Sequence, residues 1–113
     1  NGCPPELMGL GPIGASIKAL KRAELNINDI DIIELNEAFA SQSLACIKEL
    51  QINPNKVNIE GGAIALGHPL GATGSRITAK AASLMNKNNK RYALATQCIG
   101  LGQGIATVLE KFY

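Results

Sequence analysis

Apolar residues recur at three- and four-residue intervals in three segments of the chain, a spacing that predicts three amphipathic helices. The first helix is expected after a tight loop at residues 8–12, with Pro12 near its first position, where proline is favoured. The second is expected from about Ala38 and the third from near Ala72. In chain order, the predicted buried faces are Ile13, Ile17 and Leu20; Phe39, Ser43, Cys46, Ile47 and Leu50; and Ile77, Ala81, Leu84 and Met85.

Short apolar runs rich in β-branched residues lie between and after these helices and predict strands. We expect four of them, at residues 30–35, 57–59, 92–98 and 105–109. A glycine-rich turn at 100–104 separates the last two, which are therefore predicted to pair with each other. Because helices alternate with short apolar strands, the pattern predicts an α/β fold with a mixed sheet and helices packed on it.

The composition is that of one globular domain, with 113 residues of which 46% are apolar. Acids and bases are interspersed and the net charge is only +2, so no nucleic-acid partner is expected. The chain has no apolar run long enough for a transmembrane segment and no signal-peptide pattern. Three separated cysteines without a C-x-x-C pair argue against a disulfide scaffold or a metal site, and for a reducing, cytoplasmic compartment.

The only histidine, His68, lies in the glycine-rich segment, residues 61–76, directly before the third predicted helix. Histidine exchanges protons near neutral pH, and glycines let a backbone approach a ligand closely. A helix start adds free N–H donors and a positive dipole end. A structural histidine in a glycine-rich turn has the same local sequence, so this segment alone leaves both interpretations open.

Three segments share one arrangement, in which polar residues or glycines follow an apolar run: residues 35–39, the glycine-rich segment, and residues 96–100. Ligand sites of α/β sheets form beyond the carboxyl ends of strands, so we expect Asn36, His68 and Cys98 to face one cleft. A thiol and an imidazole can exchange protons, while an amide and a glycine N–H can stabilise an oxyanion. Structural alternatives are a helix cap for Asn36 and a small buried hydrophobe for Cys98.

Taken together, these segments resemble the C-terminal half of the thiolases, acyltransferases that split or join 3-ketoacyl-CoA. Residues 8–12 resemble the family's Met-Gly-x-Gly-Pro loop, and residues 36–40 its Asn-Glu-Ala-Phe motif. Residues 61–76 resemble its Gly-His-Pro signature, and residues 98–104 its C-terminal cysteine loop. The resemblance covers nearly the whole chain and implies a layered α-β-α thiolase C-terminal domain over residues 1–113, with its first strand missing.

The resemblance implies a role for each candidate residue. Asn36 would hold a water that, with His68, stabilises the enolate of departing acetyl-CoA, and His68 would also activate a nucleophilic cysteine. Cys98 would act as acid and base, and the Gly100 N–H would help form a second oxyanion hole. Ala38 and Phe39 would line the acyl end of the cleft. No metal or cofactor is implied, because coenzyme A and acyl-CoA are substrates.

The chain also departs from the thiolase pattern, and these departures change what is expected of it. No cysteine here fits the nucleophile's motif, and the chain begins Asn1-Gly2-Cys3 without a methionine, so we expect a piece of a longer protein that is inactive by itself. Its partner would be the N-terminal half of the same chain. Leu101 stands where many thiolases have glycine, and because leucine resists positive φ we expect an ordinary backbone conformation there.

Residues 98–104, together with residues 45–50, look most like the corresponding segments of the degradative 3-ketoacyl-CoA thiolases of bacterial β-oxidation. A biosynthetic acetoacetyl-CoA thiolase and a non-catalytic thiolase-like binding module remain alternatives. A decarboxylating ketoacyl synthase fits less well, because such enzymes usually place a second histidine where this chain has Asn36. The resemblance also implies a homodimer or a tetramer, with a multifunctional β-oxidation subunit as a further candidate partner.

Overall fold

A computed structural model of the chain describes residues 1–112 and has a three-stranded sheet at its centre. The strands β1 (Ile32–Leu35), β2 (Tyr92–Ile99) and β3 (Gln103–Glu110) lie in that order across the sheet. β1 runs parallel to β2, and β2 runs antiparallel to β3. The predicted mixed sheet and the pairing of the last two strands are therefore confirmed.

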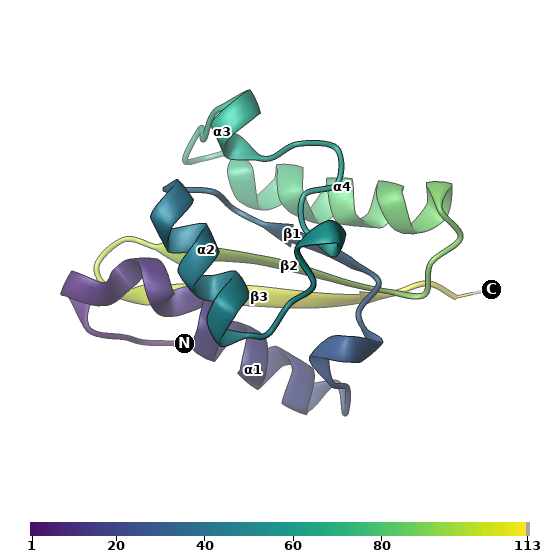
Figure 1. Ribbon diagram of the computed structural model, residues 1–113, viewed down its shortest axis with the longest axis horizontal. Coiled ribbons are helices and arrows are strands. Elements are labelled where there is room, and N and C mark those ends of the chain that lie inside the picture. The colour runs from purple at the N-terminus through teal and green to yellow at the C-terminus, as the bar shows by residue number, and fades with distance from the viewer. Residues whose placement is uncertain (113) are drawn as a thin grey trace.

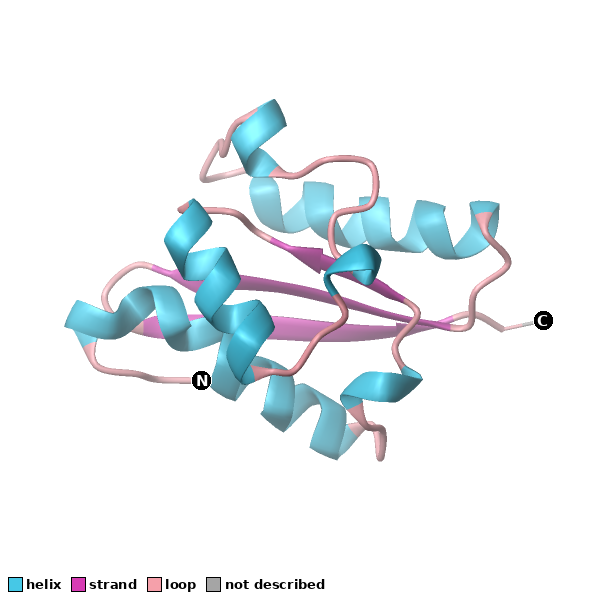
Figure 2. Ribbon diagram, in the orientation of Figure 1, coloured by secondary structure: helices cyan, strands magenta, loops and turns pink. Residues whose placement is uncertain are grey.

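Helices cover both faces of this sheet (Figures 1 and 2). α1 (Gly11–Arg22) and α2 (Ala40–Glu49) lie on one face, and α4 (Thr73–Lys87) lies on the other. The short helix α3 (Ala63–Leu66) lies within the glycine-rich segment. Three 3-10 helices complete the elements: η1 (Pro5–Leu10), η2 (Ile27–Asp29) and η3 (Pro54–Lys56). Over residues 1–112, no helix combines the length and the hydropathy that a membrane crossing requires.

Side-chain alternation along the strands divides the core between the two faces of the sheet. Ile33 and Leu35 of β1 pack with Leu94 of β2 against α1 and α2. Ile32 and Ala93 pack against α4 on the opposite face. Because helices cover both faces, every residue of β1 is buried, which explains its nearly continuous apolar sequence.

The predicted buried face holds for α4 and fails in part for the other two helices. The side chain of Ile17 is 56% exposed, because α1 turns its small residues Ala15 and Ser16 toward the sheet instead. Phe39 does not belong to a buried helical face. It precedes α2 with an extended backbone, and its ring is 63% exposed.

The prediction of a strand at residues 57–59 is wrong. Only Val57 pairs with β1, opposite Ile33, because the backbone of Asn58 adopts a left-handed conformation with φ of 47° and turns the chain away.

The expectation of an ordinary backbone conformation at Leu101 is also wrong, since the φ of Leu101 is 68°. Ile99 and Gln103 face each other across β2 and β3, and so short a connection reverses the chain only through left-handed residues.

The start of α1 lies against β3 through a contact between glycine backbones. A Cβ on Gly11 would overlap the backbone carbonyl of Gln103, and a Cβ on Gly104 would overlap the carbonyl of Gly11. The same approach brings the hydroxyl of Ser16 within 3.2 Å of the Thr96 hydroxyl, and both residues are buried. α1 therefore packs on the sheet at a distance that only glycine allows.

Gly104→Ala is expected to lower the free energy of unfolding by about 2–4 kcal/mol, because the added methyl forces α1 away from β3. The matched control is Gly71→Ala, since a Cβ at Gly71 meets no atom within 4 Å. Thermal unfolding of both variants measures the difference. Equal melting temperatures would contradict the proposed close contact.

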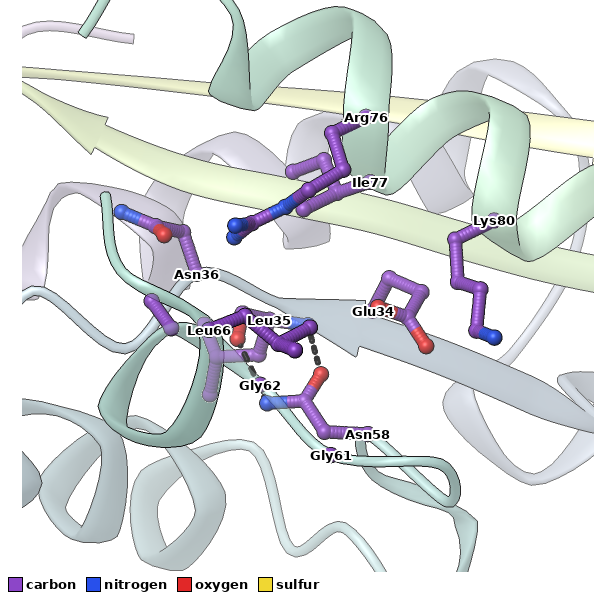
Figure 3. Close-up of a pocket in the computed structure, with 11 residues that line it drawn as sticks. Glu34, Leu35, Asn36, Asn58, Gly61, Gly62, Leu66, Arg76, Ile77 and Lys80 are labelled. Atoms are coloured by element: carbon purple, nitrogen blue, oxygen red, sulfur yellow. Dashed lines mark hydrogen bonds between the residues drawn. The ribbon is translucent and has the colours of Figure 1, made fainter. Parts of the chain in front are cut away.

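A pocket of about 90 Å³ lies between β1 and α4 (Figure 3). Glu34, 3% exposed, lines it from β1, while Arg76 and Lys80 reach toward it from α4. Among the residues described, Glu34 Oε1 and Asn36 Oδ1 are buried acceptors without a hydrogen-bond donor. Burial raises the pKa of Glu34 to about 7, although the charges of Lys80 and Arg76 oppose the rise.

This pocket makes stability depend on pH. In the unfolded chain Glu34 titrates near its ordinary pKa of 4.5, whereas in the folded chain its pKa is about 7. The folded state therefore holds the proton more tightly, and stability is lost as pH rises from about 4.5 to 7. Glu34→Gln is expected to remove this loss, which is on the order of 3 kcal/mol at pH 8.

Melting temperatures at pH 5 and pH 8 test this, with Glu60→Gln as the control. Hydrogen bonds from Lys80 and Lys87 lower the pKa of the Glu60 carboxyl to about 2, so its replacement brings no gain at pH 8. A Glu34→Gln variant that loses as much stability at pH 8 as the unchanged chain would contradict the account.

Candidate active site

The parallel pairing of β1 and β2 brings two of the candidate residues to the same edge of the sheet. Asn36 directly follows β1, and its backbone N–H donates to the Thr96 carbonyl at 2.9 Å, which extends the ladder by one residue. Cys98 is the next-to-last residue of β2. The carboxyl ends of parallel strands meet at one edge, so both residues lie where α/β sheets bind ligands.

The Asn58 side chain holds the end of β1 in place. Its Oδ1 accepts from the backbone N–H of Leu35 at 3.0 Å, and its Nδ2 donates to the Leu35 carbonyl at 2.8 Å (Figure 3). The same Nδ2 donates to Glu37 Oε1 at 2.9 Å, while Glu37 Oε2 accepts from the backbone N–H of Ile64 in α3 at 2.9 Å. Asn58 and Glu37 thus fix both neighbours of Asn36 and fasten the glycine-rich segment beside it.

His68 is an exposed residue of the glycine-rich segment. Each of its two ring nitrogens lies within hydrogen-bond distance of another side chain. Its Nε2 lies 3.3 Å from Asn36 Nδ2, and its Nδ1 lies 2.6 Å from the hydroxyl of the fully buried Thr73. Arg76 further anchors the loop by donating to the Gly67 carbonyl at 2.7 Å. The predicted convergence of Asn36 and His68 is therefore a direct contact.

A cleft of about 330 Å³ opens next to the imidazole. The residues that line it come from η1, the β1–α2 connection, the glycine-rich segment, the end of β2 and the β2–β3 connection: Met8, Ala38, His68, Leu70, Gln97, Cys98, Ile99 and Gly100. Asn36 is buried behind His68 and reaches the cleft only through its hydrogen bond to the ring. Phe39 is not part of this lining, and its exposed ring stands next to Ala38 in the chain.

The thiol of Cys98 is buried at the cleft wall, and burial raises its pKa above the ordinary value of 9.0. Cys98 is therefore a neutral thiol near pH 7, a form that donates a proton before it accepts one. The other two cysteines lie outside the cleft. Cys46 is buried in the core with its thiol donating to the Gly9 carbonyl, and Cys3 is half-buried near η1.

The arrangement combines a proton donor, an imidazole and backbone amides around one apolar-walled space, which suits the chemistry of a carbonyl compound. Over residues 1–112, no three His, Cys, Asp or Glu side chains are grouped to hold a metal ion. Sequence reasoning missed Asn58, Glu37 and Thr73. The available signals were an asparagine within an apolar run and a threonine at a helix start five residues after the histidine.

Comparison with known proteins gives one consistent result. The family model described as "Thiolase, C-terminal domain" matches residues 1–111. The "3-ketoacyl-CoA thiolase" of Vibrio vulnificus is 59% identical over 113 residues, covering 97% of this chain and 29% of the relative. That of Serratia proteamaculans is 58% identical with the same coverage. The chain thus spans about 29% of the length of the relatives that it matches.

The structural comparison agrees with the sequence comparison. The crystal structure of human mitochondrial 3-ketoacyl-CoA thiolase in complex with CoA superposes with a TM-score of 0.98 at 48% identity, over 100% of this chain and 29% of that one. A second structure of the human mitochondrial enzyme gives a TM-score of 0.96 at 49% identity, over 98% of this chain and 28% of that one. The chain belongs to the thiolase family, in which it matches the C-terminal domain.

Proposed function

We propose that this chain is the C-terminal part of an enzyme that cleaves 3-ketoacyl-CoA with CoA, giving acetyl-CoA and an acyl-CoA shortened by two carbons. The observation that carries the proposal is the single cleft containing the His68 ring, bound to Asn36, and the Cys98 thiol. The relatives named 3-ketoacyl-CoA thiolase support this substrate class and the degradative direction. A biosynthetic acetoacetyl-CoA thiolase would run the same carbon–carbon bond-breaking step in reverse.

In the proposed reaction, His68 Nε2 takes the proton of a cysteine thiol outside this chain, and the resulting thiolate attacks the 3-keto carbon. The bond between the second and third acyl carbons breaks, and its electron pair forms the enolate of acetyl-CoA. Cys98 then gives its proton to the enolate carbon, and acetyl-CoA leaves. In the second half, the Cys98 thiolate takes the proton of CoA, whose sulfur attacks the acyl-enzyme and releases the nucleophilic cysteine as a thiolate. This thiolate takes its proton back from His68, which restores the starting state.

The family resemblance, together with the contact between Asn36 and His68, supports a separate role for each candidate residue in this scheme. Asn36 and His68 would stabilise the enolate oxygen, with a water on Asn36, and the Gly100 N–H would contribute to the oxyanion hole for the tetrahedral intermediates. Ala38 lines the cleft, and the exposed ring of Phe39 beside it would contact the acyl chain at the entrance. The scheme requires no metal and no cofactor, since CoA and acyl-CoA are the substrates.

We also propose that a further part of the same protein completes this site. No cysteine of the chain fits the nucleophile's motif, and the relatives are more than three times as long. Exposed apolar side chains support the view that a further part covers the cleft. Leu70, which lines the cleft, is 85% exposed, and Leu101, which follows the lining residue Gly100 in the chain, is 90% exposed. By family, the whole protein would form a dimer or a tetramer in the cytoplasm, with a multifunctional β-oxidation subunit as a candidate partner.

In the whole protein, Cys98→Ser and His68→Ala are each expected to lower kcat for thiolysis of a 3-ketoacyl-CoA by about 10²–10⁴-fold, because each removes a proton-transfer group. Cys3→Ser is the control, since Cys3 lies outside the cleft. Initial rates measured by loss of the 3-ketoacyl-CoA absorbance check this. Near-normal activity in both cleft variants would contradict the proposed function.

The 113-residue chain by itself is expected to show no thiolysis, because it lacks the nucleophile. Adding 3-ketoacyl-CoA and CoA to the purified chain and assaying acetyl-CoA measures this directly. Turnover by the chain alone would overturn the assignment of the nucleophile to a missing part, and would call for a catalytic role for Cys3 or Cys46.

A further inference from the structure

Buried side chains hold His68 from both sides, and one of them has no role in the proposed scheme. Thr73, fully buried at the first position of α4, places its hydroxyl oxygen 2.6 Å from His68 Nδ1. This distance is short for a hydrogen bond to nitrogen, and the hydroxyl belongs to a buried residue at the start of a long helix. The contact therefore constrains the imidazole directly.

The direction of this hydrogen bond follows from proton counting. A hydroxyl has one proton to donate, and Thr73 Oγ1 donates to the Pro69 carbonyl at 3.0 Å, four residues back. Once its proton is used, Oγ1 can only accept from the ring, so Nδ1 carries a proton. In the neutral imidazole this leaves the lone pair on Nε2, the nitrogen that faces Asn36.

The contact on the other ring nitrogen agrees with this tautomer. Asn36 Nδ2 donates toward Nε2 at 3.3 Å, which requires a lone pair there. The opposite tautomer would set two N–H groups against each other, and the Asn36 amide would have to turn over to relieve the clash. The orientation of Asn36 and the tautomer of His68 are therefore linked.

We propose that Thr73 is a positioning residue that fixes the Nδ1–H tautomer of His68 and so leaves the basic lone pair of the ring on Nε2. Its consequence for catalysis rests on the proposed function. When a cysteine S–H bond breaks and its proton forms a bond to Nε2, a thiolate and an imidazolium result. The Nδ1–H bond to Thr73 is the same before and after this transfer, so the ring does not need to rotate. The Asn36 amide, in contrast, must turn its Oδ1, which otherwise has no donor, toward the new Nε2–H.

Kinetics of the whole protein test the positioning role. Thr73→Val keeps the side-chain shape but removes the acceptor, and is expected to lower kcat for thiolysis by about 10–100-fold with KM nearly unchanged. Thr73→Ser restores the hydroxyl and is expected to recover most of the activity. Thr78→Val is the matched control, because Thr78 of the same helix donates to the carbonyl four residues back, Gly74 at 2.8 Å, and touches no histidine.

A second readout does not depend on activity. Nitrogen-15 NMR of the whole protein shows which ring nitrogen of His68 carries the proton in the neutral form. The signals of this ring are identified because they disappear in the His68→Asn variant. The proposal predicts Nδ1–H in the unchanged protein and in Thr73→Ser, and a shift toward Nε2–H in Thr73→Val. If the kinetic variants fold poorly, the spectrum of the unchanged protein alone still tests the proposal, because it shows which tautomer His68 adopts.

The outcomes separate the two proposals. An Nε2–H tautomer in the unchanged protein overturns the positioning role of Thr73, as does a Thr73→Val variant as active as Thr78→Val. If the unchanged protein shows Nδ1–H but does not cleave 3-ketoacyl-CoA, the proposed function fails while the assignment of Thr73 stands.

Discussion

The hydrogen bonds of the Asn58 side chain are the constraint on which the geometry of the site depends. β1 is only four residues long, and beyond Val57 no backbone strand pairs with its outer edge within the part of the chain described. The amide of Asn58 takes the place of a strand there, bonding both the N–H and the carbonyl of Leu35. The left-handed backbone of Asn58, a conformation that asparagine tolerates, makes this possible. Asn36 is thereby held in a position from which its amide meets His68.

The same constraint explains why the glycine-rich segment stays beside β1. Glu37 links Asn58 to the backbone of α3, and a Cβ on Gly62 would displace the Glu37 carboxylate from these hydrogen bonds. From α3 the chain reaches His68 and then α4, whose first residue holds the ring. The cleft is therefore built from short segments, each fixed by side-chain hydrogen bonds rather than by sheet pairing.

Periodicity predicted the elements whose stability comes from burial of an apolar face, such as α4 and the hairpin of β2 and β3. It failed where backbone geometry is set by a polar side chain or a tight connection. Asn58 and Leu101 adopt left-handed conformations that depend on distant partners or on loop length, and neither leaves an apolar pattern. Ile17 and Phe39 were assigned to buried faces because apolarity alone does not show which side of a helix faces the sheet.

The positions of Asn36, His68 and Cys98 were predictable because the ends of parallel strands share one edge. The contacts that orient these three side chains were not predictable, because they involve Thr73 and Asn58, whose roles exist only in the folded chain.

The central claim is that this edge of the sheet is where a thioester substrate reacts. A crystal structure of the whole protein with acetyl-CoA bound tests it most directly. The account predicts the thioester in the cleft, with its carbonyl oxygen about 2.7–3.2 Å from His68 Nε2 and its acetyl group beside Cys98. A thioester bound elsewhere, with this cleft open to solvent, would contradict the account.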